Sequence, residues 1–143
     1  MTKESPIAHS APALELCSFG FKHGGIEANL VIDVRFLPNP YYVPALCHMT
    51  GKDAPCAAYV FKDPATGAFA ESLANLVLAM ESSFREQGKA ALKVAVGCTG
   101  GQHRSVAVVE AVAAALRGRG LAPEVRHREF GRVQQASGRL QDS

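Results

Sequence analysis

The sequence predicts an α/β domain of three layers with a mainly parallel sheet. Short apolar segments typical of strands alternate with longer segments whose apolar residues recur at helical spacing. The chain has 143 residues, 48% of them hydrophobic and 20% charged, which is enough for one domain with a real core and too little for two. We therefore expect one domain over residues 13–135, after a disordered segment over 1–12 and before a frayed tail over 136–143.

The first two elements are predicted strands. Residues 13–21 and 29–36 are short, apolar and rich in residues that favour strands. Their relative direction stays open, because the link between them is short. Residues 37–56 are rich in proline and aromatic residues, so we expect a loop or short turns there rather than regular structure. Loops of this length are usually functional or disordered.

Two helices and two further strands complete the predicted fold. Six apolar residues between 68 and 87 recur at helical spacing, and Gly88 ends this helix: Phe69, Leu73, Leu76, Val77, Met80 and Phe84. Residues 91–98 are a predicted strand. Apolar residues at 106, 109, 112, 113 and 116 predict a second helix that ends near Gly118 and Gly120, and residues 123–130 are a candidate last strand.

Composition bounds the class of protein. The formal net charge of +2 is too small to indicate a nucleic-acid or membrane partner by itself, although six arginines lie in residues 114–143. No apolar run approaches the roughly 18 residues that a membrane-spanning helix needs, and the N-terminus does not resemble a signal peptide. We therefore expect a cytoplasmic protein with reduced thiols. The cysteines at 17, 47, 56 and 98 show no zinc-like spacing, so we expect no metal and no cofactor.

The segment VAVGCTGGQHRSVAVVE, residues 94–110, carries the main functional signal. A strand that turns sharply into a helix leaves the first N–H groups of the helix unpaired at the positive end of its dipole, and this geometry binds anions. Glycines at 97, 100 and 101 let the backbone approach a ligand, while Thr99 and Ser105 offer hydroxyls and Arg104 a forked cation. Such sites lie at the carboxyl ends of strands in open α/β sheets. The loop is therefore predicted to bind a phosphate group.

Two known kinds of phosphate chemistry use a loop at a strand-to-helix junction. A Walker A loop needs a lysine, and none lies here, so the pattern does not support ATP hydrolysis by that route. Cys98 and Arg104 do match the C-x5-R-[ST] spacing of cysteine-dependent phosphatases, and a helix N-terminus and an arginine both lower a thiol pKa. The general acid of such an enzyme would be Asp33 or Asp63. A phosphatase that uses Cys98 and Arg104 therefore remains the alternative.

Five segments occur in an order that points to a family. They are SFGFKHG (18–24), DVRFLPNPYY (33–42), LCHMTGKDAPCAAYV (46–60), GCTGGQHRSVAVVE (97–110) and VRHRE (125–129). Together they resemble the C-terminal domain of the RapZ family of RNase adapters, of the YvcJ-type nucleotide-binding proteins. The resemblance runs from Cys17 to about Glu129. It implies an α/β module that binds glucosamine-6-phosphate, an amino-sugar phosphate, and small regulatory RNAs, with no catalytic step of its own.

The resemblance also implies the residues of the site. Eight residues match the GCTGG-HRS loop of the family and would form the phosphate pocket: Gly97, Cys98, Thr99, Gly100, Gly101, His103, Arg104 and Ser105. Asp33, Arg35 and Asn39 match its DVRFLPNP segment and would face the same pocket, where Asp33 would recognise a sugar hydroxyl or amine. From the residues alone, His103 is equally a surface histidine, and Asp33 and Arg35 an ordinary surface pair.

The sequence departs from the family pattern in three places. It contains no Walker motifs, so we expect a domain that stands without the N-terminal nucleotide-binding domain of the family. Gln102 occupies a position where we expect lysine, and the segment after Val125 contains arginines but no lysines. RNA binding is therefore less well supported than anion binding.

The last predicted strand carries the candidate RNA contacts. Arg126 and Arg128 would lie on one face of the strand and His127 on the other, and they would contact RNA phosphates or form a solvated edge. The sequence thus predicts a regulatory module that binds a phosphorylated small molecule and acts as an adapter for structured RNA or an RNA-processing protein. Self-association is open, and an RNA-binding module without a small ligand is a further alternative.

Overall fold

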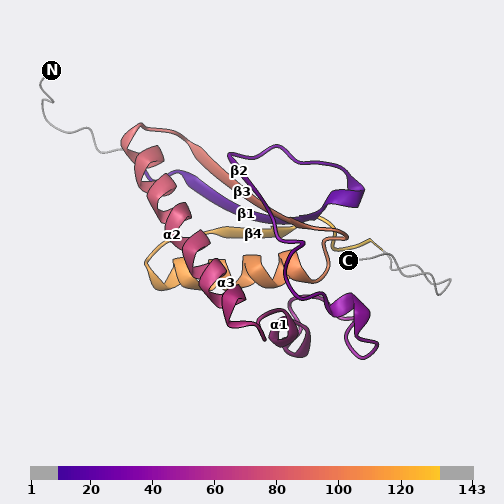
Figure 1. Cartoon of the computed structure of the whole chain (residues 1–143). Helices are drawn as coiled ribbons and strands as arrows, with labels where there is room; N and C mark the ends of the chain where they lie inside the picture. Colours follow the sequence, from indigo (N-terminus) through magenta and orange to yellow (C-terminus); the bar gives the residue numbers. More distant parts are fainter. Residues whose placement is uncertain (1–9, 133–143) are drawn as a thin grey trace, which may run out of the picture.

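Four parallel strands form the centre of the computed structural model, which describes residues 10–132 (Figure 1). They are β1 (Ala13–Gly20), β2 (Leu30–Asp33), β3 (Ala91–Cys98) and β4 (Glu124–His127), in the spatial order β2-β3-β1-β4. Every neighbouring pair is parallel, and β1 and β2 both pair with β3. This confirms the predicted parallel sheet and fixes the relative direction of the first two strands. Residues 1–9 and 133–143 lie outside the described residues, so the predicted tail over 136–143 and most of the predicted disordered segment over 1–12 stay predictions.

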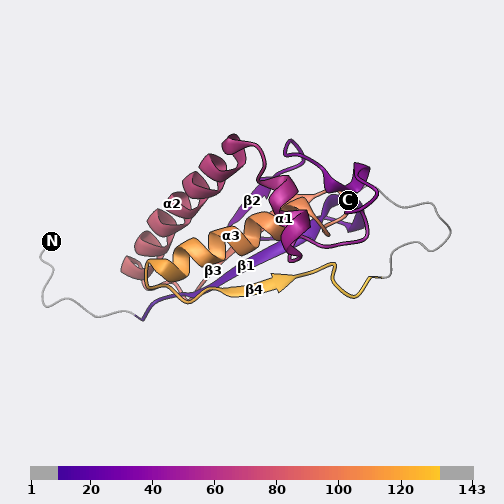
Figure 2. The same cartoon turned by 90° about the horizontal axis from the view of Figure 1, so that it is seen from below.

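The helices lie together on one side of this sheet (Figures 1 and 2). They are α1 (Ala54–Val60), α2 (Pro64–Glu86) and α3 (Arg104–Gly118). The segment between β1 and β2 passes over the other side and contains a 3-10 helix, η1 (Phe21–His23). The predicted α/β domain of three layers is therefore confirmed, with an irregular third layer. Within residues 10–132, no helix combines the length and the apolar composition needed to cross a membrane.

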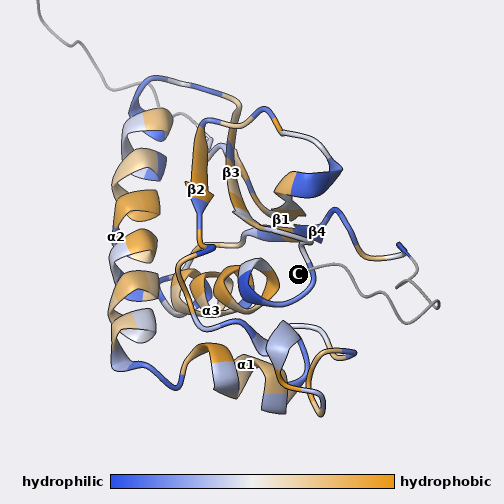
Figure 3. Ribbon diagram, turned by 45° about the vertical axis from the view of Figure 1, so that its right-hand side comes forward, coloured by the Kyte–Doolittle hydropathy of each residue, from blue (hydrophilic) through white to orange (hydrophobic). Residues whose placement is uncertain are grey.

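The core lies between the sheet and the two longer helices. Alternate residues of β1 and β3 face it, among them Leu14, Leu16, Val94 and Val96, and they pack against α2 and α3. Figure 3 shows hydrophobic colouring along β2 and β3 and on much of α2. Five of the six predicted apolar positions of α2 contribute to this core, whereas Leu76 is 44% exposed. Each fully buried valine or leucine contributes about 1.5–3 kcal/mol relative to an exposed one, so this face holds the helices in place.

The prediction that residues 37–56 contain no regular structure was wrong at the end of that segment. Helix α1 begins at Ala54, with Pro55 in its first turn, and α2 begins at Pro64 rather than at residue 68. A proline in the first turn is compatible with a helix, because its missing N–H would have no intrahelical partner there. Asp63 caps α2, since its Oδ1 accepts a hydrogen bond from the Ala65 N–H at 3.0 Å.

The remaining boundaries differ by a few residues from the predicted ones. Helix α3 begins at Arg104, and the last strand covers only residues 124–127 of the predicted 123–130. Before α1, a second 3-10 helix, η2 (Pro40–Tyr42), leads into turns up to residue 53. Gly51 in these turns donates its N–H to the Gln102 carbonyl at 2.8 Å, so this segment packs directly against the start of α3.

We predict that Gly51→Ala lowers the free energy of unfolding by about 1–3 kcal/mol, as overpacked sites do. A Cβ at Gly51 would lie 2.4 Å from two backbone atoms, Ala107 N and His103 O, and neither can move aside without moving α3. Gly67→Ala is the matched control: Gly67 lies in α2 with open space around it, and alanine favours a helix by about 1 kcal/mol. Urea denaturation should show a lower free energy of unfolding for Gly51→Ala and a higher one for Gly67→Ala. A Gly51→Ala protein as stable as the wild type would contradict the close packing at Gly51.

Candidate phosphate-binding site

The parallel sheet brings the carboxyl ends of its strands to one edge, and the predicted site segments meet there. Strand β2 ends at Asp33, and β3 ends at Cys98. Just beyond these ends, the Val34 N–H donates to the Gly97 carbonyl at 2.8 Å, and the Lys22 N–H donates to the Thr99 carbonyl at 3.1 Å. The structure therefore brings the segment after β2 and the glycine-rich loop after β3 side by side.

The loop from β3 to α3 is held by backbone packing. Gly101 has a φ of +80°, and a Cβ there would lie 2.5 Å from Glu129 Cγ and 2.7 Å from Gly20 N, so only glycine fits. Gly100 lies against Gly20 at the end of β1 in the same way. Both glycines of the loop are buried, and Thr99 is partly exposed. These glycines thus let the loop backbone pack closely against the end of β1, and a similar close approach to a ligand stays a prediction.

Backbone N–H groups in this loop are available to a ligand. Among the loop and turn hydrogen bonds between backbone groups in residues 10–132, none is donated by residues 99–102 or 104–106. The first regular bond of α3 is donated by Ala107 to the His103 carbonyl at 3.0 Å. The earlier N–H groups of a helix have no carbonyl four residues back and carry the positive end of its dipole. The loop and the start of α3 therefore present a set of donors suited to an anion.

Arg104 places a buried cation at this helix start. Its side chain is only 4% exposed, and its Nη1 donates to the Arg35 carbonyl at 2.6 Å. Its Nε is buried without a hydrogen-bond partner. Among the described residues, no carboxylate lies within ion-pair distance of this guanidinium. A buried cation without a direct ion pair and with an unsatisfied donor is unfavourable, so the site is electrostatically suited to a bound anion.

Asp33 and Arg35 form the exposed side of the same region. Their side chains make an ion pair of 2.7 Å, each 46% exposed, and the Arg35 guanidinium lies 4.2 Å from the centre of the Phe21 ring. The hydrogen bonds from Arg35 hold the pKa of the Asp33 carboxyl below its usual value, and the charge of Arg104 acts in the same direction. Asp33 is therefore an ionised acceptor beside Arg104.

Asn39 has a structural role that the sequence did not predict. Its Oδ1 accepts a hydrogen bond from the Tyr41 N–H at 3.1 Å and so caps η2. This bond shapes the proline-rich turn that follows Arg35 in the chain. A contact between Asn39 and a ligand stays a prediction.

Three further loop residues are buried in the protein interior. His103 is fully buried and its Nε2 lies 3.1 Å from the Cys47 carbonyl, so the ring fastens the turns before α1 to the start of α3. Cys98 is also fully buried, within the core, and its Sγ lies 3.2 Å from Ser105 Oγ. These contacts support the shape of the loop. Direct contact of these three side chains with a phosphate stays a prediction.

The candidate RNA residues of β4 differ from one another in their surroundings. Arg126 is 59% exposed and lies 3.7 Å from Glu15. His127 lies between Ser18 Oγ at 2.6 Å and Glu110 Oε2 at 2.8 Å on α3, as expected for a residue on the opposite face. Arg128 donates to the carbonyls of residues 24 and 25, each at 2.8 Å. Only Arg126 of the three presents a largely exposed cation.

Glu129, to which the sequence motifs assign no role of its own, is a buried member of this region. Its carboxylate accepts hydrogen bonds from the Gly20 N–H at 3.0 Å, from Arg128 at 2.9 Å and from Arg132 at 2.6 Å. Burial raises the pKa of the Glu129 carboxyl, but the Gly20 N–H and the two cations outweigh it and hold the pKa below its usual value. The sequence contains one signal for this role, since Glu129 follows the last strand and therefore lies at the same edge of the sheet as the site.

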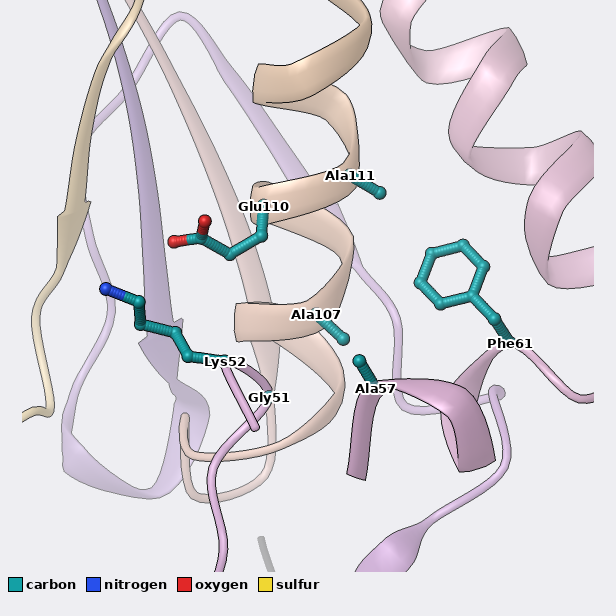
Figure 4. A pocket seen from close by; sticks show the side chains of 7 residues that line it. All are labelled: Gly51, Lys52, Ala57, Phe61, Ala107, Glu110 and Ala111. Atoms are coloured by element: carbon teal, nitrogen blue, oxygen red, sulfur yellow. The ribbon is translucent and has the colours of Figure 1, made fainter. Parts of the chain in front are cut away.

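A separate cavity of about 390 Å³ lies between α1 and α3 (Figure 4). It is lined by apolar residues such as Ala57 and Phe61 and by two charged residues, Lys52 and Glu110. None of the residues predicted to bind phosphate lines it. The cavity is therefore distinct from the candidate site at the edge of the sheet.

Residues 10–132 form an α/β domain with a strand-to-helix loop that is suited to anions. Residues 12–131 match the family model of the RapZ C-terminal domain, so the chain belongs to that family. This confirms the family to which the sequence motifs pointed.

Relatives with similar sequences are named as nucleotide-binding proteins. One from Streptomyces avermitilis is 47% identical over 116 residues, which cover 80% of this chain and 39% of that protein. Another from Lactiplantibacillus plantarum is 49% identical over 72% of this chain and 35% of its own length, and a third from Laribacter hongkongensis is 49% identical over 80% and 42%. The chain thus spans about two fifths of the length of these relatives.

We predict that the Cys98 thiol of the folded protein is protected from alkylation, because a thiol reagent cannot reach a fully buried Sγ. Iodoacetamide labelling followed by mass spectrometry should modify Cys98 at least about 100-fold more slowly than in urea. If the wild type hydrolyses p-nitrophenyl phosphate and Cys98→Ser does not, this prediction is contradicted and the phosphatase is favoured.

Proposed function

We propose that this domain binds the phosphate group of a small metabolite in the loop 97–105 and acts as a regulatory module that responds to it. Membership of the RapZ C-terminal domain family supports a binding or regulatory module. The names of the relatives support a phosphorylated ligand. The observation that carries the proposal is Arg104, a buried guanidinium whose Nε has no partner, at the start of a helix whose first N–H groups are free.

The roles of the site residues follow from this arrangement. A phosphate oxygen would accept hydrogen bonds from backbone N–H groups of the loop and from Arg104. The phosphate would thereby supply the direct ion pair that Arg104 lacks within residues 10–132. The partly exposed Thr99 would add its hydroxyl. Because Asp33 is ionised beside Arg104, it is the group that would accept a hydrogen bond from an amine of the ligand. An amino-sugar phosphate such as glucosamine-6-phosphate combines both groups, and the family resemblance supports this choice.

We predict that Arg104→Gln weakens binding of glucosamine-6-phosphate by about 10- to 100-fold, since a hydrogen bond to a charged group contributes about 1.5–3 kcal/mol. Isothermal titration calorimetry measures the affinity, and circular dichroism verifies that the variant is folded. Arg126→Gln is the matched control, because Arg126 is exposed and lies outside the loop. Equal affinities of the wild type and Arg104→Gln would refute the assignment of the pocket.

Ligand specificity tests the role of Asp33 separately. Glucose-6-phosphate has a hydroxyl in place of the amine of glucosamine-6-phosphate and should bind the wild type more weakly. Asp33→Asn should reduce this preference while binding of the phosphate group persists. A preference that is unchanged in Asp33→Asn would leave the phosphate site intact but assign recognition of the amine elsewhere.

We further propose that the same module acts as an adapter for structured RNA or for an RNA-processing protein. The support is the arginine-rich end of the chain, where the side chains of Arg126 and Arg132 are 59% and 50% exposed. Exposed guanidinium groups on an edge strand are suited to RNA phosphates. Arg128 is bound to backbone carbonyls and Glu129, so it would support this surface rather than contact RNA.

We predict that Arg126→Ala weakens binding of a structured RNA and reduces the slope of log K against log salt by about one. Filter binding between 50 and 200 mM salt measures the slope. Arg119→Ala, at the far end of α3, is the control that removes an arginine elsewhere. An unchanged slope would exclude Arg126 from the RNA surface. If added glucosamine-6-phosphate does not change the RNA affinity, RNA binding is independent of the proposed ligand.

A further inference from the structure

Glu129 contacts the loop through both its side chain and its backbone. Its Cγ would lie only 2.5 Å from a Cβ at Gly101, so the side chain packs directly against the loop. Its backbone carbonyl accepts a hydrogen bond from Gln102 Nε2 at 3.0 Å. Two consecutive loop residues therefore rest on one residue that follows β4. The second contact also gives Gln102 a role in the position where lysine was expected, because its amide fastens the loop instead of adding a cation.

The carboxylate of Glu129 also holds the arginines around it. Oε2 accepts from Arg128 Nε at 2.9 Å, and Oε1 accepts from Arg132 Nε at 2.6 Å. The same carboxylate accepts the Gly20 N–H at the end of β1. Glu129 is fully buried, so these three donors satisfy a charge that water does not reach. Glu129 therefore contacts the loop and both arginines at the same time.

We propose that Glu129 is a positioning residue for the phosphate-binding loop, and that it links occupancy of this loop to the placement of Arg128 and Arg132. The link to a bound anion rests on the function proposed above. The positioning itself does not, because it acts in the protein without a ligand. Through this contact, an anion in the loop and the arginine-rich segment each stabilise the arrangement that the other needs.

The alternative is that Glu129 stabilises the whole fold and has no particular effect on the loop. The two roles differ in which amides they protect from hydrogen exchange. Lys22 and Gly51 donate their N–H groups to the loop carbonyls of Thr99 and Gln102, so the exchange of these two amides reports how firmly the loop is held. Amides in α2 report global stability instead.

The first experiment measures amide exchange by NMR in the protein without ligand. We expect Glu129→Gln to speed exchange of the Lys22, Gly51 and Arg128 amides by about tenfold or more relative to those of α2. Gln102→Ala removes only the hydrogen bond from Gln102 to the Glu129 carbonyl and should speed exchange of the Gly51 amide. This variant should be folded even if Glu129→Gln is not. Glu81→Gln is the matched control, since Glu81 is also buried and paired with an arginine at 2.7 Å but lies in α2. The control should speed exchange of the loop amides and the α2 amides to the same extent. The same uniform acceleration in Glu129→Gln would overturn the positioning role.

The second experiment adds inorganic phosphate as the probe. In the wild type, phosphate should slow exchange of the Lys22 and Gly51 amides and also of Arg128 and Arg132, whose N–H groups donate to Ser18 O and Glu129 O. In Gln102→Ala, phosphate should still slow the Lys22 amide but have a smaller effect on Arg128 and Arg132. Protection of the loop reporters alone in the wild type would overturn the link to the arginines. No protection anywhere would refute the phosphate site, while the ligand-free comparison would still decide the positioning role.

Discussion

The parallel pairing of β1 with β3 is the interaction on which the candidate site depends. The pairing runs in register from Ala13 and Ala91 to Gly20 and Cys98, so the two central strands end side by side. The chain that leaves β3 must turn immediately into α3, and it does so across the end of β1. Because β2 and β4 run in the same direction, the segments that follow them arrive at the same edge. Four distant parts of the sequence meet there for this reason alone.

Three buried charges show how differently this edge is built from the rest of the domain. Glu81 in α2 is paired with an arginine one turn later, an arrangement that needs nothing beyond the helix. Glu129 is satisfied by donors from the end of β1 and from the chain after β4. Arg104, at the start of α3, has a buried donor without an acceptor. The carboxylate of Glu129 is thus satisfied within the protein, whereas the guanidinium of Arg104 keeps one unsatisfied donor.

Local patterns were sufficient to predict most of the fold. The spacing of apolar residues located α2 and β3, because both bury one face along their whole length. The proline-rich pattern does not predict the start of α1, because proline is typical of loops although Pro55 is compatible with the first turn of a helix. Residue type alone makes Asp63 a candidate general acid, whereas its role as the cap of α2 depends on where that helix begins.

The site was predictable only where it is local in the sequence. Glycines, hydroxyls and an arginine at one junction indicated the anion loop, since all of them lie within nine residues. The spacing of Cys98 and Arg104 gave no information about burial, and burial separates a core thiol from an exposed nucleophile. Glu129 escaped because its hydrogen bond to Gly20 joins residues 109 positions apart. Contacts of this kind follow from the order of the strands, which no local pattern encodes.

The edges of the sheet set a limit on how another chain can approach this domain. Both edge strands, β2 and β4, have only four residues, and in the described part of the chain each offers few backbone groups for pairing. Arg126 on β4 adds an exposed charge at one of these edges. Short, charged edges discourage the addition of a foreign strand. A partner therefore has to recognise this domain by its side chains and loops, so its choice of partner can change through surface substitutions that leave the sheet untouched.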